Sequence, residues 1–495
     1  MVTEGMKAML TESQYSAGTT LELKTIVREL SADLETPISV YLKLRDSQPS
    51  FLLESVEGGE RIARYSFVGI QPRAQYLVRG AQIQIIQGTS TQIVELQPDS
   101  DPTFFLQNEI ARYQSHHQSG LPRFIGGLVG YMSFETVRFF EPTLTPHLKT
   151  PQLPDAFFLL ADIIVAFDHA RRSLFLIANV LEGDEESANS KLDEIVRKIH
   201  QPLPTTVKTT LPASVMQSNM AKEAFENMVE TAKEHITAGD IFQVVLSQRF
   251  DRQTEVEAFE VYRAVRRLNP SPYMFYFDFG QVDDQPFYVV GASPEMFVRL
   301  EDGRAALRPI AGTRRRGVDA EADAALAESL LADPKERAEH VMLVDLGRND
   351  LGRVCEYGSV KVSEFSTIER YSHVMHIVSH VEGILNPDLT AFDLVRAAFP
   401  AGTVSGAPKI RAMEIIGELE HDVRGPYAGM IGYFGFDGAM DTCLAIRTLV
   451  ARGKTFSVQA GAGIVADSDP TSEYQETINK ASAMLRAIDI AETNS

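Results

Sequence analysis

The sequence lacks tryptophan altogether and contains only two cysteines, Cys355 and Cys443, in 495 residues. Two cysteines exclude a disulfide framework and a cysteine-rich metal site, and they are typical of proteins from a reducing compartment. The missing tryptophan is not a general shortage of aromatic residues, because the chain has 27 phenylalanines and 15 tyrosines. With 44% apolar residues the chain can form large cores, and its length is typical of about three domains.

Positive charge is also scarce. Only 47 lysines and arginines stand against 67 aspartates and glutamates, which gives a net charge of −20. Such a charge repels nucleic-acid phosphates and anionic membranes, so we expect neither as a partner. The sequence also lacks a long apolar run and a basic, apolar export signal at its start, so we expect a cytoplasmic protein. An anionic substrate would need cations gathered locally at its site.

The chain divides at residues 201–218, a segment that is rich in proline and threonine and has no apolar periodicity. Before it, after a tail at residues 1–20, short strand-like runs predict a mainly antiparallel sheet over residues 21–200. Examples of these runs are Gln82–Ile86 and Asp162–Phe167.

After the linker, capped helices alternate with strands over residues 219–490. The first helix is expected to begin near Asn219 and to end at Gly239, with its apolar residues on one face.

Two pairs of glutamates have the spacing of one helical turn, Glu336 with Glu339 and Glu473 with Glu476. Residues three apart lie on one face of a helix, and carboxylate oxygens are the ligands that Mg²⁺ prefers. Glu339 shares a helical stripe with Leu343 and so points toward the core, where a carboxylate needs a partner. With the glycine-containing segment 308–313, the two pairs predict a magnesium-held anionic substrate.

Each pair also has an ordinary structural interpretation. Asp333, Pro334 and Glu336 form the pattern of a helix N-cap with a capping-box glutamate. Glu476 and Lys480 are four residues apart, which is the spacing of an exposed ion pair that contributes only about 0.2–0.5 kcal/mol. The spacing by itself leaves both interpretations open.

Two glycine-rich segments superficially match nucleotide-binding loops. Gly461-Ala462-Gly463 follows a predicted strand, but Asp469-Pro470 delays the next helix, unlike a dinucleotide-binding turn. The segment 402–409 has the wrong spacing for a phosphate-binding loop, and Pro408 lacks a backbone donor. We therefore expect no nucleotide, and we interpret the glycines at 461–463 as backbone N–H donors to an anion.

Five further strings occur in a specific order: Leu52-Leu-Glu-Ser55, Asn269-Pro-Ser-Pro-Tyr-Met-Phe-Tyr276, Gly291-Ala-Ser-Pro-Glu295, Asp345-Leu-Gly-Arg-Asn-Asp350 and Gln459-Ala-Gly-Ala-Gly463. With them the sequence resembles the chorismate-utilising enzymes, and within them the large components of anthranilate synthases, over almost its whole length. The resemblance implies an α+β fold with two large sheets and intervening helices, whose N-terminal and C-terminal portions pack together. A chain that makes tryptophan without containing it would still be translated when tryptophan is scarce.

The resemblance also implies a site. Chorismate carries two carboxylates, a ring hydroxyl that must leave and an enolpyruvyl ether, and the implied metal ligands are Glu339 and Glu476, which would hold Mg²⁺. The implied substrate-binding residues are Gly312, Thr313, Tyr427, Arg447, Gly461, Ala462, Gly463 and Lys480. The implied catalytic residues are Glu295, which protonates the leaving hydroxyl, with His376 and Thr313, which assist.

The residue types alone leave plain alternatives for three of these positions. Glu295 is equally explained as a turn carboxylate after a strand and the turn 291–294, His376 as a hydrogen-bonded core histidine on one strand face, and Arg447 as a surface salt-bridge partner. An acid role for Glu295 at neutral pH requires a raised pKa, which burial would supply.

Two positions bear on the product. Relatives that add water carry a lysine where this chain has Gln243, and many that make aminodeoxychorismate carry a lysine nucleophile where it has Ala311. Neither glutamine nor alanine can act as that base or nucleophile. Both departures favour attack by ammonia and formation of anthranilate and pyruvate.

The sequence contains no glutaminase motif, because neither cysteine lies in a glycine-rich nucleophile turn. The resemblance implies that a separate glutamine amidotransferase subunit supplies ammonia to this chain. The alternatives are the large component of an aminodeoxychorismate synthase and a catalytically silent, tryptophan-sensing paralogue.

The resemblance finally implies feedback inhibition by L-tryptophan at a second site. The sequence segments that predict it are far apart, and an apolar slot for the indole with polar groups for the amino-acid ends is expected where they meet. Its predicted residues are Leu52, Leu53, Glu54, Ser55, Pro272, Tyr273, Met274, Asp441 and Cys443.

Overall fold

The fold is analysed in a computed structural model of the chain. It describes residues 7–11, 20–55, 64–98, 100–115, 120–180, 185–204, 211, 214–371 and 374–494. The predicted tail at 1–20 and the predicted linker at 201–218 therefore lie partly outside the described residues.

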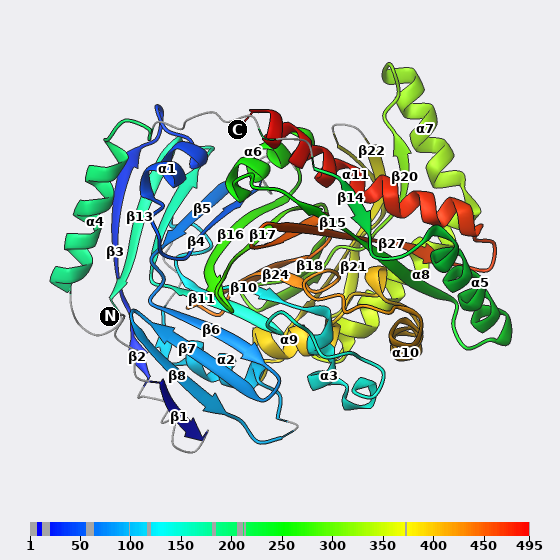
Figure 1. The fold of residues 1–495 in the computed structure, drawn as a ribbon, viewed down its shortest axis with the longest axis horizontal. Helices are drawn as coiled ribbons and strands as arrows, with labels where there is room; N and C mark the ends of the chain where they lie inside the picture. Colours follow the sequence, from blue (N-terminus) through cyan, green and yellow to red (C-terminus); the bar gives the residue numbers. More distant parts are fainter. Residues whose placement is uncertain are drawn as a thin grey trace.

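Two large sheets dominate the described residues, and almost all of their strand pairs are antiparallel (Figure 1). The 13-stranded sheet contains, in spatial order, β1 (Lys7–Thr11), β8 (Ser90–Glu95), β7 (Gln82–Gln87), β6 (Ala74–Arg79), β11 (Ala156–Ala161), β10 (Gly127–Met132), β24 (Met430–Gly435), β25 (Met440–Leu444), β18 (Met296–Glu301), β19 (Arg304–Leu307), β22 (Val374–Ile384) and β20 (Ile310–Arg315), with β21 (Lys361–Arg370) beside β22. The 12-stranded sheet contains β14 (Met216–Ser218), β15 (Gln243–Gln253), β27 (Thr455–Ile464), β26 (Thr448–Arg452), β17 (Gln285–Ser293), β16 (Tyr273–Val282), β4 (Ser50–Glu54), β5 (Tyr65–Ile70), β12 (Ile163–Asp168), β13 (Ser173–Val180) and β3 (Lys24–Ser31), with β23 (Gly406–Ala407) beside β15. A short parallel pair, β2 (Leu21–Glu22) with β9 (Tyr113–Gln114), completes the strands.

Both sheets contain strands from either side of the predicted linker. In the larger sheet β10 pairs with β24, and in the smaller sheet β4 pairs with β16. Each of these pairs joins a strand that precedes residue 201 to one that follows residue 218. The two portions therefore fold as one body, and the α+β class with two large sheets is confirmed.

The two sheets share an apolar core rich in aromatic side chains. Phe157 of β11, Phe277 of β16 and Tyr433 of β24 belong to one cluster of buried residues drawn from both sheets. All six residues of β10 and of β11 are buried, because these strands have an apolar layer on each face. Continuous burial of this kind explains why they are apolar throughout rather than alternating.

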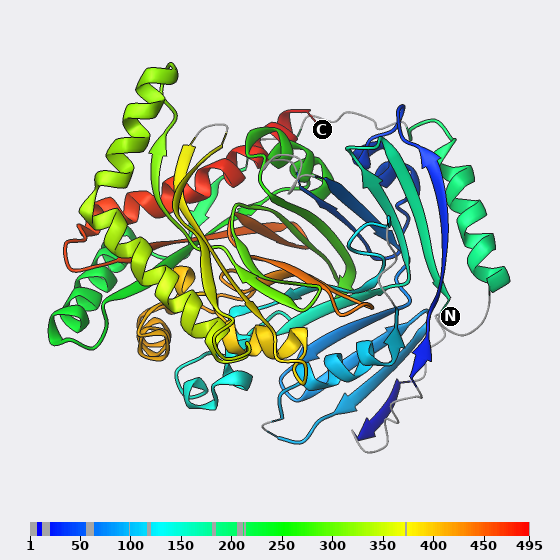
Figure 2. The same cartoon turned by 180° about the vertical axis from the view of Figure 1, so that it is seen from behind.

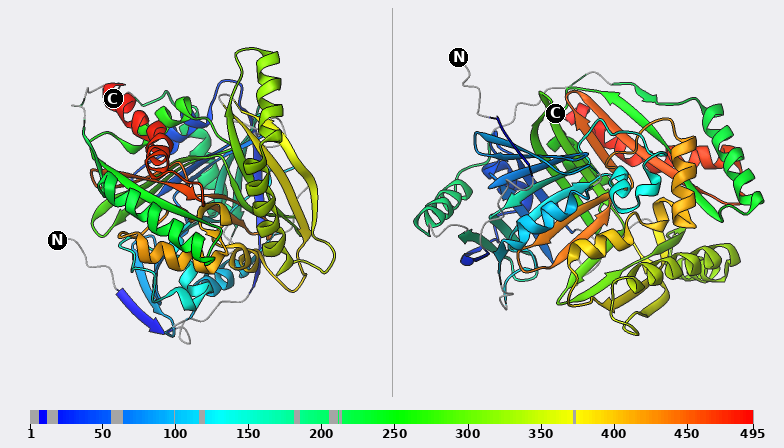
Figure 3. Two further views of the ribbon diagram at one scale, coloured as in Figure 1. Left: turned by 90° about the vertical axis from the view of Figure 1, so that its right-hand side faces the viewer. Right: turned by 90° about the horizontal axis from the view of Figure 1, so that it is seen from below.

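Helices cover the outer faces of the sheets, as the view from behind also shows (Figure 2). The helices packed on the core of the 12-stranded sheet are α1 (Pro37–Leu44), α4 (Glu185–Ile199), α6 (Ala258–Leu268) and α11 (Pro470–Asn494). The others are α2 (Thr103–Ala111), α3 (Val137–Phe140), α5 (Lys222–Ala238), α7 (Ala320–Ala332), α8 (Pro334–Gly352), α9 (Ala391–Ala398) and α10 (Lys409–Leu419), with 3₁₀ turns η1 (Phe134–Thr136), η2 (Pro142–Leu144) and η3 (Gly402–Val404). The side view shows that α7 projects beyond the body of the molecule (Figure 3). None of the helices among the described residues is long and apolar enough to cross a bilayer.

The helix boundaries follow the predicted caps closely. Helix α5 begins at Lys222, three residues later than expected, and ends at Gly239, whose φ of 84° is the left-handed conformation favoured by glycine. Helix α8 begins at Pro334, and the Asp333 side chain accepts hydrogen bonds from the first turn. The predicted capping-box role of Glu336 is wrong, because its carboxylate accepts instead from Arg314 Nη1 at 3.0 Å.

Candidate active site

Nearly all predicted catalytic, metal and substrate-binding residues line one cavity of about 660 Å³, here called the catalytic cavity. Its walls are formed by β15, β20, β22, β27, α8, α11 and η3, together with the loops that precede β18 and β24 and the loop that follows β25. The predicted residues found there are Glu295, Gly312, Thr313, Glu339, His376, Tyr427, Arg447, Gly461, Gly463, Glu476 and Lys480. Gln243 and Ala311 line it as well.

Glu295 lies between β17 and β18, and its carboxyl is buried. Burial raises its pKa to about 8, although the Thr403 hydroxyl and the Lys480 ammonium nearby lower it. The predicted turn at 291–294 is shorter than expected, because β17 continues through Ser293. The Glu295 carbonyl accepts from Leu444 N at 3.1 Å and so fixes the backbone beside β25. At neutral pH Glu295 is therefore mainly protonated, which is the form of a general acid.

His376 is held on β22 by a contact that determines its tautomer. Its Nδ1 lies 2.8 Å from the Gly312 carbonyl oxygen and 3.2 Å from Thr313 Oγ1. A carbonyl accepts only, so Nδ1 carries the proton and Nε2 keeps a lone pair. Burial lowers the pKa of His376, the bond to Gly312 opposes this, and the Arg447 charge adds to the lowering. The ring is thus a neutral proton acceptor.

The glycine-containing segment that contacts His376 is a strand with a bulge. The register between β20 and β22 shifts between Ala311 and Arg314, and Gly312 has a φ of +63° at this point. Glycine adopts this conformation without steric cost, and the bulge turns the Gly312 carbonyl toward His376.

Arg447 reaches the cavity from a strained backbone. Its φ of 52° is unusual for a residue with a side chain, and its carbonyl accepts from Ala292 N at 3.1 Å. Burial lowers the pKa of the guanidinium, while Tyr427 and Glu476 oppose this. Burial raises the pKa of Tyr427 to about 12, so its hydroxyl stays protonated. Both side chains can donate hydrogen bonds to a carboxylate.

The glycines at 461–463 lie inside strand β27, not in a loop, and so the predicted glycine cradle takes a different form. β27 pairs with β15 up to Ile464, whereas its pairing with β26 ends at Val458. A Cβ atom on Gly461 would lie 2.6 Å from the Tyr427 hydroxyl. The side chain of Ala462 is fully buried in the core on the opposite face, so only its backbone is near the cavity.

The acidic residues come from two helices, α8 and α11. Burial raises the pKa of Glu339, and the neighbouring Glu336 adds to the increase. Gln243 Nε2 lies 3.4 Å from Glu339 Oε1. Glu476 and Lys480 form the ion pair that their spacing predicts, at 2.6 Å, and both also line the cavity. The ion-pair interpretation is therefore confirmed, and metal binding by Glu476 stays a prediction.

The donor set of the cavity suits a cation that needs few protein ligands. In the described part of the chain, no group of three histidine, cysteine or acidic side chains is arranged to hold a metal ion. Mg²⁺ keeps several waters and takes one or two carboxylates with the substrate, so Glu339 and Glu476 fit it. Apart from Glu295, the lining has four carboxylates, at 336, 339, 473 and 476, against three cations, Lys335, Arg447 and Lys480. A dianionic substrate would be repelled here without an additional cation.

Several lining residues were not predicted, among them Thr403, Gln459 and Asn479. Thr403 belongs to the segment 402–409. That segment was considered from the sequence only as a phosphate-binding loop, and was rejected. Thr403 Oγ1 is buried beside the Glu295 carboxyl, whose pKa it lowers. The glycines near Thr403 were the only sequence feature that drew attention to this segment, and they did not indicate that Thr403 lies beside Glu295.

A second cavity, of about 50 Å³, lies between the two sheets and is lined by all eight residues from Leu53–Ser55, Pro272–Met274, Asp441 and Cys443. The segments meet because β4 pairs with β16, with Glu54 opposite Met274. Leu52 was predicted in this slot, and this is wrong: it packs into the core on the other face, because neighbouring strand residues point in opposite directions.

Charged groups around the second cavity are paired. Asp441 is 2.9 Å from Arg299 Nη2 and accepts from the Tyr273 hydroxyl at 3.0 Å. Glu54 accepts from Arg266 Nε at 2.9 Å and from Tyr262. Ser55 Oγ, in contrast, is buried with no partner among the described residues.

Comparisons with known proteins agree on one family. The profile of the family described as chorismate binding enzyme matches residues 34–486. The sequence is 47% identical to anthranilate synthase component 1 of Pseudomonas aeruginosa over 475 residues, which covers 94% of this chain and 95% of that protein. It is 47% identical to the protein of the same name from Aquifex aeolicus over 474 residues, which covers 94% of each. The crystal structure of anthranilate synthase component I from Streptococcus pneumoniae superposes with a TM-score of 0.76 at 38% identity, and the match covers 92% of this chain and 99% of that one.

Proposed function

The chain belongs to the chorismate binding enzymes, and from this membership we propose that it is the synthase component of an anthranilate synthase, converting chorismate and ammonia to anthranilate and pyruvate. One observation supports the chemistry most strongly. A protonated, buried Glu295 and a neutral His376 line the same cavity as Arg447, Tyr427 and the glutamates of α8 and α11.

Binding comes first. Arg447 and Tyr427 donate to a substrate carboxylate, and Lys480 adds a charge that Glu476 orients. Glu339 and Glu476 would hold Mg²⁺, which supplies the positive charge that the lining lacks and acts as a Lewis acid on a carboxylate.

Loss of the ring hydroxyl follows from the protonation state of Glu295. Its carboxyl donates a proton to the hydroxyl, which leaves as water while ammonia forms the C–N bond and then loses a proton. In the second half of the reaction the ring C–O bond to the enolpyruvyl group breaks, the ring loses a C–H proton and becomes aromatic, and the departing enolpyruvate takes up a proton to become pyruvate. We assign the ring C–H proton to His376, because Nδ1 is occupied by the Gly312 carbonyl and Nε2 is the available acceptor.

Two side chains disfavour neighbouring activities. Gln243 and Ala311 both line the cavity, and neither offers an amine that could activate water or form a covalent adduct. An aminodeoxychorismate synthase is the second candidate, but Ala311 speaks against it. A silent paralogue would have no reason to keep Glu295 protonated beside an intact carboxylate clamp.

The decisive assay uses the purified chain with chorismate, MgCl₂ and an ammonium salt. We expect anthranilate, followed by its fluorescence and identified by mass, and no product when the metal is chelated. Aminodeoxychorismate as the final product, or no turnover at any ammonium concentration, would overturn the assignment.

Ammonia must come from a partner, because neither cysteine is suited to glutamine hydrolysis. Burial raises the pKa of Cys355 to about 11 and raises that of the fully buried Cys443 as well. A thiol that stays protonated is a weak nucleophile. We therefore propose a glutamine amidotransferase subunit as the partner, in the cytoplasm. Glutamine should support synthesis only after that subunit is added, and turnover of glutamine by the isolated chain would contradict this.

We further propose that L-tryptophan binds in the second cavity and inhibits. Its volume of about 50 Å³ has room for only a few water molecules, so an indole requires the cavity to open. Two strands connect it to the catalytic cavity: β18 leads from Glu295 to Arg299, and β25 carries Asp441 and continues toward Arg447. Opening around Asp441 and Arg299 would displace Glu295 and Arg447, and by linkage chorismate should weaken tryptophan binding by the same factor.

A further inference from the structure

A buried ion pair lies directly behind the wall of the catalytic cavity. Glu420 follows α10, Arg424 lies in the loop before β24, and their side chains are only 5% and 1% exposed. The contact is bidentate: Arg424 Nη2 is 2.6 Å from Glu420 Oε1, and Arg424 Nε is 2.9 Å from Glu420 Oε2. A pair this deep is stabilising only if its remaining donors and acceptors are also satisfied.

The remaining donors of Arg424 reach two residues that line the cavity. Nη2 donates to the Val245 carbonyl at 2.7 Å, and Nη1 donates to the Val404 carbonyl at 2.9 Å. The guanidinium also lies over the Tyr427 ring, 5.6 Å from its centroid. Val245 belongs to β15 and Val404 to η3, so one side chain contacts three separate parts of the cavity wall.

Glu420 extends the connection to a fourth part of the wall. Its Oε1 accepts from the Ser247 backbone N at 2.8 Å and from Ser247 Oγ at 2.9 Å. Ser247 Oγ accepts in turn from Gln459 Nε2 at 2.8 Å, and Gln459 lines the cavity on β27. The loop that carries Arg424 is itself fixed, because the buried Glu135 carboxylate accepts from the backbone N of Arg424 at 2.7 Å.

We propose that Arg424, through its pair with Glu420, is a positioning residue for chorismate: it holds β15, η3 and Tyr427 at the spacing that the substrate requires. The inference rests on the proposed function. A planar guanidinium can meet a carboxylate and two carbonyls at once, whereas a lysine ammonium is a single point on a flexible stem. Arg424→Lys therefore keeps the charge and loses the geometry.

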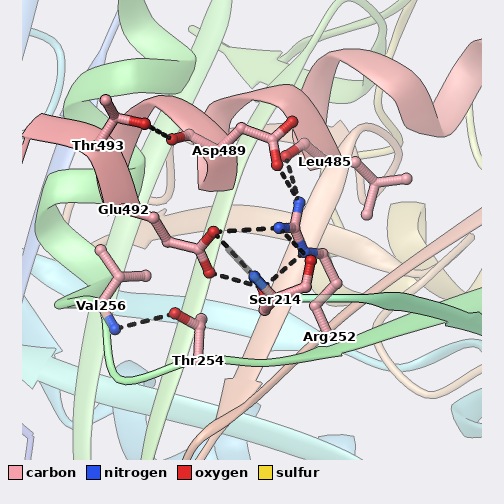
Figure 4. Close-up of polar contacts among 8 residues, drawn as sticks. All are labelled: Ser214, Arg252, Thr254, Val256, Leu485, Asp489, Glu492 and Thr493. Atoms are coloured by element: carbon pink, nitrogen blue, oxygen red, sulfur yellow. Dashed lines mark hydrogen bonds and ion pairs between the residues drawn. The ribbon is translucent and has the colours of Figure 1, made fainter. Parts of the chain in front are cut away.

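Loss of stability alone must be separated from this role, because weakening one partner of a buried pair is destabilising wherever the pair lies. Arg252 provides the matched control (Figure 4). It is 5% exposed, contacts Asp489 at 2.6 Å and Glu492 at 3.1 Å, and donates to the Ser214 carbonyl at 2.9 Å. These contacts tie the end of α11 to β15, and none of these partners lines the catalytic cavity.

The experiment compares Arg424→Lys and Arg252→Lys in the full chain. Melting temperature, kcat and KM for chorismate are measured with saturating ammonium, well below both melting temperatures, and chorismate affinity is measured by calorimetry with Mg²⁺ and no ammonia. We expect both variants to melt earlier, and only Arg424→Lys to raise KM and Kd for chorismate, by about tenfold or more. A Kd for Arg424→Lys within twofold of wild type, or an equal rise in Arg252→Lys, would overturn the proposal.

A second variant covers the case in which Arg424→Lys does not fold. Glu420→Gln keeps the shape and an oxygen acceptor for Ser247 but removes the charge that orients Arg424, so a smaller rise in Kd is expected, and an unchanged Kd would again overturn the proposal. Wild-type protein that binds chorismate without forming anthranilate would contradict the proposed function, while the calorimetric comparison would still test Arg424.

Discussion

Acidic and basic residues line both the catalytic cavity and the second cavity, but their surroundings affect the charged forms in opposite directions. In the catalytic cavity, burial lowers the pKa of Arg447 and raises that of Glu339. Burial therefore disfavours the charged form of both side chains. In the second cavity, burial opposes the charge on Arg299, but Asp441 outweighs it and raises the pKa. In the first arrangement charged ligands would supply the missing partners, whereas in the second the charges already have partners within the protein.

The comparison also separates reactive from structural carboxyls. Glu295 is enclosed and has no close cation strong enough to ionise it, whereas the buried Glu54 is held by Arg266 and Tyr262. Burial alone therefore does not identify a catalytic acid. Burial without a compensating partner, in a cavity large enough for a substrate, is what supports the acid role proposed for Glu295.

The largest expected effect tests whether the carboxylates of the catalytic cavity hold a metal ion. Glu339→Gln and Glu476→Gln should each lower kcat/KM for chorismate by about a thousandfold, the equivalent of about 4 kcal/mol, because each removes a charged oxygen from a site with few ligands. Titration with MgCl₂ measures the change in metal dependence. Asp345→Asn, on the exposed side of α8, is the control and should be neutral. Normal activity with unchanged magnesium dependence in both glutamate variants would remove the metal assignment.

A smaller loss is expected at Glu295. Glu295→Gln should lower kcat by about 10²–10⁴-fold, because an amide cannot donate the proton. In the wild type the protonated form is active, so the rate should fall as pH rises through about 8, where the carboxyl ionises. The residual rate of the variant should show no such fall. A wild-type rate that keeps rising above pH 9 would contradict the acid role.

The second cavity should respond in inhibition and not in catalysis. Ser55→Phe fills the slot, so the inhibition constant for tryptophan should rise by about 10–100-fold while kcat stays within about twofold. Ser50→Ala is the control, because Ser50 begins β4, the strand that ends just before Ser55, but its hydroxyl contacts Tyr41 in the other core. Tryptophan that competes inside the catalytic cavity, unaffected by Ser55→Phe, would break the comparison between the two cavities.

The last expected effect concerns stability and not turnover. The folded-state pKa of Glu295, about 8, lies above its ordinary value of 4.5, so the unfolded chain releases this proton earlier as pH rises. Wild-type stability should therefore decrease between pH 4.5 and 8, by at most about 1.4 kcal/mol per pH unit from this group. Glu295→Gln has no such proton, and its melting temperature relative to wild type should increase from pH 5 to pH 8. An equal difference at every pH would show that Glu295 is ionised when folded.

Much of the local structure could be predicted from the sequence. The caps Asp333 and Gly239 begin and end helices as expected, because capping depends on residues close in the chain. The strand at 461–463 and the bulge at Gly312 were not predicted, because glycine also fits a turn, and the choice depends on pairing with β15 and β22. Leu52 was predicted in the wrong core for a related reason: the face of the sheet toward which a side chain points is known only when the strand register is known.

The sequence by itself determined the caps of helices α5 and α8, the pairs of glutamates and the order of motifs that identifies the family, since all of these depend on residue types at short separations. Only the tertiary structure decided which distant residues act together. It brings Leu53–Ser55 beside Pro272–Met274 through the pairing of β4 with β16, and it places Arg424 against three parts of the cavity wall. It also decided that Glu295 keeps its proton, because a pKa depends on how completely surrounding segments exclude water, and those segments are distant in the chain.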